Sequence, residues 1–494
     1  MLFSSAIFLF LFLPIVLLGH LLLPRSWRNL FLLLASLFFY AWGETVYTSI
    51  MLVSITGNYF LTRLMAGSPT QFQKKIILIV AIILNLALLC WFKYANFFTV
   101  NINTVLQAFG FSAIALEAVH LPLGISFFTF QALSYVVDVY KGKVEVQKKF
   151  VNLALYIALF PQLIAGPIVR YRHIAEEIIQ RDIKLSNYAY GIRRFIIGLA
   201  KKMIIANPLG EVANTIFAMA PGEWSLPVSW LGTACFAIQL YFDFSGYSDM
   251  AIGLGRMLGF TFLENFNYPY IATSFREYWQ RWHISLSMWF RDYLYIPMGG
   301  NRCSRLRTQL NLWCVFTLVG LWHGASWNFV LFGALHGFFM VLERVGLNRL
   351  LRRLWWPFRH AYFIVLYLLC FGVFCTRNIS EAGIYVSAMT GLSKAGTGGI
   401  ALDLITLRLF PLDKQVIFLV GCLLSVPWQG VPARIWNRIR PHLSTGALGW
   451  VTSAQPWLAT TYQVMQLVAL FGIFSLSIMH VAAGTYNPFI YFRF

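Results

Sequence analysis

The residue whose type and position best suit chemistry is His323, in the segment Leu321-Trp-His-Gly324. It lies inside a long apolar run, with Trp313–Gly320 on one side and Phe329–Phe332 on the other. An ionisable side chain within a membrane-spanning segment is costly and therefore indicates a functional site. The reference pKa of histidine, about 6.5, suits a general base near neutral pH. The alternative is a core histidine that is only hydrogen-bonded.

A second histidine, His283, lies in a segment dense in polar and aromatic residues. On a continuous helix, at about 100° per residue, Arg276, Gln280, His283 and Ser287 share one face. This stripe predicts a helix that lines a polar tunnel. The alternative is a helix at the membrane interface, where tryptophans are common.

His336 follows His323 by 13 residues, which is about 20 Å along one continuous helix. The two could share a small substrate only if that helix breaks, so His283 is the best candidate partner of His323. A metal site needs three or four converging ligands, and no His, Cys, Asp or Glu spacing supplies them. We therefore expect no metal.

These residues suit acyl transfer, which needs a base for a hydroxyl proton and donors for the developing oxyanion. A Trp N–H, an Arg or a second His can donate to that oxyanion. The chain has no GxSxG nucleophile elbow and no catalytic cysteine pattern. Direct transfer from a thioester donor to a hydroxyl is therefore favoured over a serine-nucleophile hydrolase.

The composition places these residues in a membrane protein. Of 494 residues, 59% are hydrophobic and 11% are charged, which excludes a soluble enzyme, a disordered chain and a collagen. The net charge of +20 fits basic cytoplasmic loops better than nucleic-acid binding, and no nucleic acid is expected. Seven cysteines without a CxxC pattern indicate buried apolar side chains and no disulfide framework.

Apolar runs then predict an all-α, multi-pass integral membrane protein with about 11 transmembrane helices, plus re-entrant or interfacial helices. Some runs, such as 309–343, are too long for one span and are tilted, paired or re-entrant. The basic loop 24–28 is expected in the cytoplasm, which puts the N-terminus outside. One domain, 1–494, is predicted, with its catalytic centre at about 240–340 and a soluble cytoplasmic loop at about 429–460.

Several motifs together resemble the membrane-bound O-acyltransferase family, in particular its bacterial polysaccharide branch of the alginate O-acetyltransferase membrane-subunit type. The resemblance runs nearly from end to end, and each motif alone is weak. The motifs are Leu2-Phe-Ser-Ser5, Leu121-Pro-Leu-Gly-Ile-Ser-Phe127, Phe160-Pro-Gln-Leu-Ile-Ala-Gly-Pro167, Tyr241 to Gly255, Tyr278 to Tyr295 and Leu321-Trp-His-Gly324.

The resemblance implies a funnel of helices around a central tunnel with a thin centre, and acetyl-CoA as a donor that enters from the cytoplasm. No permanently bound cofactor is implied. His323 would be the main catalytic residue, with His283 as orienter or oxyanion stabiliser. Residues implied to shape and charge the tunnel or to position substrate are Asp243, Asp249, Arg276, Arg281, Trp282, Asp292, Trp322 and Asn328.

The resemblance also implies a place and partners. The implied location is the bacterial inner membrane. The implied partners are membrane lipid and a periplasmic acetyltransferase that modifies an exported polysaccharide. Tyr491 and Arg493 belong to an aromatic tail that either anchors at the interface or enters the tunnel and carries the acyl group. Alternative substrates are cellulose or another exopolysaccharide, peptidoglycan, or a D-alanyl acceptor. From other classes, a transporter or flippase and a tethering scaffold remain open.

Overall fold

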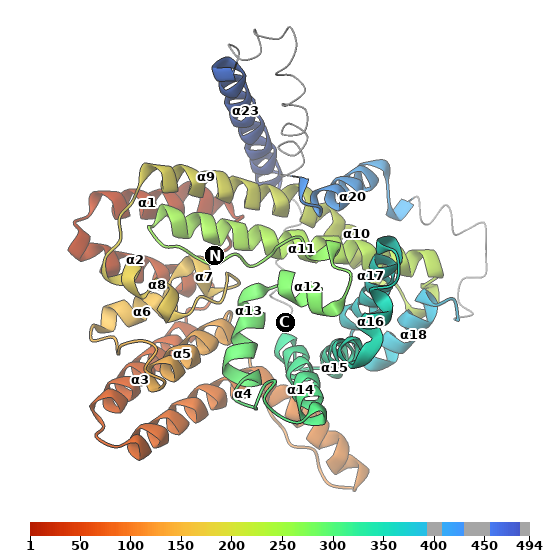
Figure 1. Ribbon diagram of the computed structural model, residues 1–494, viewed down its shortest axis with the longest axis horizontal. Helices are drawn as coiled ribbons and strands as arrows, with labels where there is room; N and C mark the ends of the chain where they lie inside the picture. The colour runs from red at the N-terminus through yellow and green to blue at the C-terminus, as the bar shows by residue number, and fades with distance from the viewer. Residues whose placement is uncertain (393–407, 429–454, 485–494) are drawn as a thin grey trace.

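The computed structural model of the protein describes residues 1–392, 408–428 and 455–484 (Figure 1). All regular secondary structure in these residues is helical, which confirms the all-α prediction for the described part of the chain. The predicted loop at about 429–460 lies almost wholly outside the described residues, and so do Tyr491 and Arg493 of the predicted tail.

The first part of the chain, up to residue 218, folds into helices joined mostly by short turns. Thr70 begins the longest of them, because its side chain accepts a hydrogen bond from the Gln73 backbone N–H. The helices are η1 (Phe8–Phe12), α1 (Leu13–Leu22), α2 (Arg25–Ala41), α3 (Tyr47–Gly67), α4 (Gln71–Ala108), α5 (Ile125–Tyr140), α6 (Phe150–Ala158), α7 (Phe160–Leu163), α8 (Tyr171–Ile179), α9 (Leu185–Ala200), η2 (Lys201–Ala206) and α10 (Asn207–Ala218).

The second part contains one long helix followed by several short ones and a helical hairpin. The elements are η3 (Pro221–Glu223), α11 (Leu226–Met257), η4 (Pro269–Ile271), α12 (Phe275–Arg281), α13 (Ile284–Phe290), η5 (Arg291–Tyr295), α14 (Arg305–His323), α15 (Trp327–Leu342), η6 (Glu343–Leu347), α16 (Asn348–Leu351), α17 (Trp356–Cys375), α18 (Ile379–Met389), α20 (Leu412–Leu424) and α23 (Gln455–Ala482).

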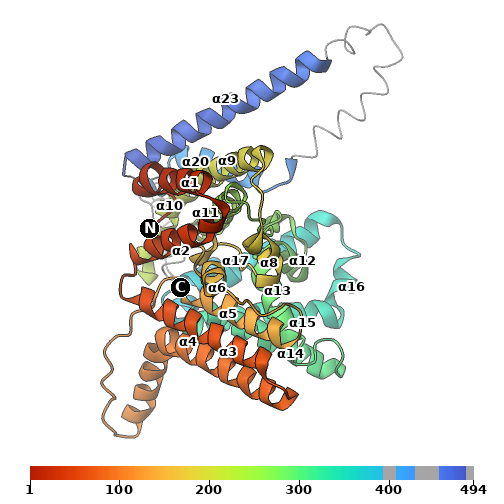
Figure 2. The ribbon, with the colours of Figure 1, turned by 90° about the vertical axis from the view of Figure 1, so that its left-hand side faces the viewer.

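The helices surround a centre that is occupied by short elements (Figure 1). Long helices α9 and α11 pack side by side, α3, α4 and α5 form a second group, and α14, α15 and α17 form a third. The short helices α7, α12 and α13 lie between these groups. Figure 2 shows α23 extending past the body of the molecule beside α9. The long helices surround the short, interrupted ones. The backbone polar groups that the short helices leave without helical partners are thereby kept away from lipid, as a membrane requires.

Four helical stretches among the described residues are long and apolar enough to cross a membrane: Gln71–Ala108, Trp327–Leu351, Trp356–Cys375 and Gln463–Ala482. Two shorter apolar helices, Phe8–Leu22 and Ile125–Tyr140, accompany them. Large apolar side chains on their outer faces, such as Leu22 and Phe471, are exposed and suit contact with lipid. The total of about 11 spans stays a prediction.

The long apolar run 309–343 is a hairpin of α14 and α15, which is one of the arrangements that its length allowed. Gly320 on α14 and Gly333 on α15 let the two backbones touch. A Cβ atom on Gly320 would come within 2.1 Å of the Phe329 carbonyl oxygen, and one on Gly333 within 2.3 Å of the Phe316 carbonyl oxygen. Only glycine fits at such a crossing, which is a common basis of helix packing in membranes. The hairpin fixes His323 at the last position of α14.

Candidate active site

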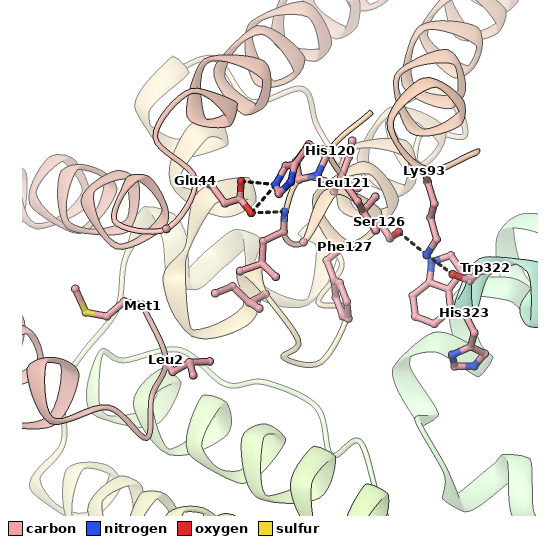
Figure 3. A pocket seen from close by; sticks show the side chains of 16 residues that line it. Met1, Leu2, Glu44, Lys93, His120, Leu121, Ser126, Phe127, Trp322 and His323 are labelled. Carbon is pink, nitrogen blue, oxygen red and sulfur yellow. Dashed lines mark hydrogen bonds and ion pairs between the residues drawn. The ribbon is translucent and has the colours of Figure 1, made fainter. Parts of the chain in front are cut away.

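His323 faces a cavity of about 480 Å³, which we call the first cavity (Figure 3). His323 and Trp322 lie at one end of it, with Lys93 and Ser126 beside them, and Met1 lies at the other end. The complete lining is Met1, Leu2, Gly43, Glu44, Lys93, His120, Leu121, Pro122, Leu123, Gly124, Ile125, Ser126, Phe127, Ile164, Trp322 and His323. The cavity therefore connects His323 with the face of the molecule that carries Met1.

A second cavity, of about 520 Å³, lies further back along α14. Three arginines, Arg276, Arg291 and Arg344, contribute to its wall, together with Glu343 and with apolar, hydroxyl and amide side chains. Val319 on α14 lines the second cavity, whereas Trp322 lines the first. Three residues are less than one helical turn, or about 5 Å of α14. The two cavities thus approach each other at the end of the helix that carries His323.

The predicted helix through the polar stripe is wrong, because the chain breaks at His283. This residue has the left-handed backbone angles φ 42° and ψ 55°, and it separates α12 from α13. A left-handed residue without glycine's freedom costs energy and is most often found where function or packing enforces it. The break turns His283 away from the stripe, and only Arg276, Gln280 and Ser287 line the second cavity together.

Asn265 holds the break in place, and sequence reasoning missed this residue. Its side-chain oxygen lies 3.1 Å from His283 Nδ1 and accepts hydrogen bonds from the Ser285 backbone N–H at 3.2 Å and the Ser285 hydroxyl at 2.9 Å. Its backbone carbonyl accepts from the Ile284 N–H at 2.9 Å. Asn265 is buried, so solvent water does not reach this position to accept the same hydrogen bonds in its place. The only sequence signal was an asparagine within a segment rich in aromatic residues.

Replacing Asn265 with alanine should lower acyl-transfer turnover by about 10- to 100-fold, since a buried His283 and Ser285 then lose their acceptor. Asn265→Asp keeps the acceptor oxygen and should retain more activity than Asn265→Ala. Turnover of protein that elutes as a single species from size exclusion checks both variants. Equal turnover of Asn265→Ala and wild type would show that the break does not need this contact.

Three of the buried histidines, His283, His323 and His336, lie close together around two aromatic rings. The Trp322 ring centroid lies 5.0 Å from that of His323 and 6.0 Å from that of His283. Phe332 contacts His323 and His336, with centroid distances of 6.3 and 4.2 Å. The chain between His323 and His336 is not one continuous helix, because α14 ends at His323 and α15 begins at Trp327. This break is the condition under which the two histidines could lie near each other. His283 is brought near His323, as predicted, with Trp322 touching both.

The other candidate tunnel residues line neither of these two cavities, and their role in shaping a tunnel stays a prediction. Asp243 pairs with Lys202 at 2.8 Å, and Asp249 pairs with Arg194 at 2.6 Å and Lys201 at 2.7 Å. These ion pairs join α11 to α9 and η2, which gives both carboxylates a structural role.

Three further candidates have equally local partners. Arg281 forms an ion pair with Glu277, one helical turn before it, at 3.0 Å. The Asn328 amide donates to the Thr376 carbonyl, and Trp282 is buried, with its ring 5.0 Å from that of Phe266. Each of these side chains therefore contacts neighbouring protein groups and lines neither cavity.

Asp292 joins the short segment η5 to the loop before α8. Its carboxylate lies 2.6 Å from Arg170 and 2.7 Å from Arg291. Burial opposes ionisation of this carboxyl, but the hydrogen bonds from Arg291 and Arg170 outweigh it and lower the Asp292 pKa to about 2. Asp292 therefore stays ionised at neutral pH and holds Arg170, which is buried, beside the segment that carries Arg291. No cluster of three or more potential metal ligands occurs among the described residues.

Comparison with known proteins adds a family and several relatives. The sequence model of the membrane-bound O-acyltransferase family matches residues 75–376, which include Lys93, Asn265, His283, His323 and His336. The chain is 37% identical, over the full length of both proteins, to the probable alginate O-acetylase AlgI of Azotobacter vinelandii.

Two other relatives act on cell-wall polymers. The chain is 38% identical to the peptidoglycan O-acetyltransferase of Helicobacter pylori over 70% of each protein. It is also 30% identical to the teichoic acid D-alanyltransferase of Bacillus subtilis, over 51% of this chain and 67% of that protein. The relatives thus share acyl transfer and differ in the acceptor.

Proposed function

Because the chain belongs to the membrane-bound O-acyltransferase family, we propose that it is the membrane component of an O-acetyltransferase for an exported, alginate-type polysaccharide. The full-length similarity to the alginate O-acetylase favours this polymer over peptidoglycan or a D-alanyl acceptor. The observation that carries the proposal is His323 at the end of α14, where the first cavity approaches the second cavity that lies along the same helix.

The second cavity suits the donor, acetyl-CoA. Arg276, Arg291 and Arg344 line it, and guanidinium groups bind phosphates well. The phosphates of coenzyme A would lie among these arginines, and the acetyl thioester would extend toward Val319 and His323. Acetyl-CoA is then a substrate, and the site needs no resident cofactor. This arrangement places the second cavity on the cytoplasmic side and Met1 on the outer side.

Arg344→Ala is expected to raise the KM for acetyl-CoA by about 10-fold and to leave kcat nearly unchanged, because a phosphate contact far from the thioester contributes uniform binding. Arg305→Ala removes the same charge outside this cavity and should leave KM unaltered. Initial rates at varied donor concentration and at two salt concentrations check this. A fall in kcat with unchanged KM would place Arg344 in the chemistry instead.

The first cavity suits the acceptor. A hydroxyl group that enters past Glu44 and Leu123 would meet His323, which takes its proton as the oxygen attacks the acetyl carbonyl. The C–S bond of the tetrahedral intermediate then breaks, and the leaving thiolate takes the proton that His323 accepted, which restores the neutral imidazole. We assign His283, held by Asn265, to orientation or to stabilisation of the oxyanion. The acceptor is a periplasmic acetyltransferase partner that passes the group to the polymer in the inner-membrane assembly.

The proposal is tested with detergent-purified protein and acetyl-labelled acetyl-CoA. Thiol release and transfer of the label to the partner, both dependent on the protein, are the expected results. A chain that binds substrate and moves it along a gradient without thiol release would be a transporter instead. Thiol release from D-alanyl thioesters but not from acetyl-CoA would show that the protein is a D-alanyl transferase of the same family.

A further inference from the structure

Lys93 is a lysine in the middle of the apolar helix α4, and nothing in the reaction above uses it. It lies within the candidate membrane span Gln71–Ala108 and is almost fully buried. None of the ion pairs among the described residues includes it, so no carboxylate lies within 4.0 Å of its amine there. A buried lysine in a membrane helix is costly, and its cost has to be offset by a function.

The Lys93 amine contacts the end of α14 next to His323. It donates a hydrogen bond to the Trp322 carbonyl and another, at 3.5 Å, to the Ser126 hydroxyl, and it lies 5.5 Å from the Trp322 ring centroid (Figure 3). Its neighbour Tyr94 donates from its hydroxyl to the Leu321 carbonyl at 3.0 Å. Two successive residues of α4 thus reach two successive carbonyls at the end of α14.

Those carbonyls need partners, because the last four carbonyls of a helix have none within the helix. Many helices solve this with a left-handed glycine, but Gly324 has a φ of −170° and leaves α14 in an extended conformation. The C-terminal end of a helix also carries a partial negative charge, which a lysine ammonium complements. Lys93 and Tyr94 therefore form a cap supplied by another helix.

We propose that Lys93 is a positioning residue for the acyl-transfer reaction, whose amine fixes the Trp322 carbonyl and thereby the direction of His323 in the first cavity. This inference rests on the proposed function only for its turnover assay. Tyr94 supports the same end of the helix without a charge. The cap makes the position of His323 depend on α4, which is more than 200 residues away in the sequence.

The first experiment compares wild type, Lys93→Ala, Lys93→Met and Tyr94→Phe by turnover. Loss of one charge-assisted hydrogen bond predicts a kcat lower by about 10- to 100-fold in both lysine variants, with KM for acetyl-CoA unchanged. Tyr94→Phe should lose less. Propylammonium matches the atoms missing in Lys93→Ala and should restore at least part of kcat, whereas propanol should not.

Two controls keep the result specific. Propylammonium should do nothing for Lys93→Met, where the space is filled, and nothing for His323→Ala, which also corrects for direct reaction of the amine with the thioester. Wild-type kcat in both lysine variants would overturn the proposal. A loss of kcat that propylammonium leaves untouched in Lys93→Ala would also overturn it, since Lys93 would then only fill space.

A second measurement needs no substrate, so failure of the proposed function does not affect it. Modification of His323 by diethylpyrocarbonate is followed by mass spectrometry in wild type and Lys93→Met, with His360 as the internal reference. The His323 rate is expected to change by several-fold, while the His360 rate stays constant. Identical His323 rates in the two folded proteins would show that Lys93 does not position this histidine.

Discussion

His323→Ala is expected to lower acetyl transfer by about 1,000-fold or more, the upper range of the contribution of a general base. The imidazole is the ionisable group at the end of α14 that borders the first cavity, and it follows Val319, which lines the second cavity, by about one turn of helix. His323→Gln keeps a similar size without the base and should fall as far. Thiol release from labelled acetyl-CoA in the presence of the acceptor partner measures the effect.

His360→Gln is the matched control for this substitution. His360 is a half-buried histidine whose ring nitrogen lies 3.1 Å from the Ala272 carbonyl oxygen, and it lines neither cavity. Its variant should keep nearly full activity. If His323→Gln transferred acetyl groups at the wild-type rate, His323 would be structural and the base would have to be sought at His283 or His336.

Gly320→Val should remove most of the folded protein, which is the largest expected effect on stability. The Cβ atom would overlap the Phe329 carbonyl oxygen and the backbone of Gly333, and these belong to a helix that cannot move without opening the hairpin. Forced separation of packed helices typically costs several kcal/mol, comparable to the entire stability of many proteins. The yield of monodisperse protein and its thermal unfolding midpoint in detergent provide the measurement.

Gly57→Val is the control, because nothing lies within 4 Å of a Cβ atom at that position of α3. It should purify with an unfolding midpoint close to that of wild type. A normal midpoint for Gly320→Val would mean that α14 and α15 do not touch at Gly320 and Gly333 in the native membrane protein.

The sequence was sufficient to predict the helical class and the family and to single out His323, whose catalytic role stays a prediction, because these depend on residue type. A lone imidazole in an apolar run and a set of co-occurring motifs need no three-dimensional information. The family is confirmed by the match over residues 75–376. His283 was also chosen for its residue type, and the structure places it beside Trp322.

Backbone geometry was harder to predict. Periodicity assumes a continuous helix, and nothing in Arg281-Trp-His283 announces a left-handed residue, since neither glycine nor proline is present. Asn265 stabilises this geometry from 18 residues away, which no local pattern reveals. In contrast, Gly324-Ala-Ser326 is a recognisable breaker, and it does mark the turn between α14 and α15.

Lys93 shows a different limit. An apolar-run analysis treats a lysine as the end of a span, yet α4 continues for 15 residues beyond it to Ala108. The Lys93 side chain is stabilised within the helix by its hydrogen bond to the Trp322 carbonyl at the end of α14, more than 200 residues away. Long-range contacts of this kind decide where a polar residue is tolerated, and composition alone does not contain them.

The short distance between the two cavities also has an electrical consequence for acetyl transfer across a membrane. The acetyl group leaves the thioester as a formal cation, and a hydroxyl on the other side loses a proton to receive it. If each side exchanged its proton with its own water, one positive charge would move outward in every turnover. An inside-negative potential would oppose that movement by about 2.3 kcal/mol per 100 mV.

A base within reach of both sides removes this opposition. His323 lies about one turn of α14 from Val319 in the wall of the second cavity, so under the proposed function a proton taken from the outer hydroxyl would have a short path to the inner thiolate. Under the proposed function, one proton would then move inward for each acetyl group that moves outward, and the exchange would be electroneutral. An energised membrane would neither drive nor hinder acetylation, and the cell could modify its polymer at any membrane potential.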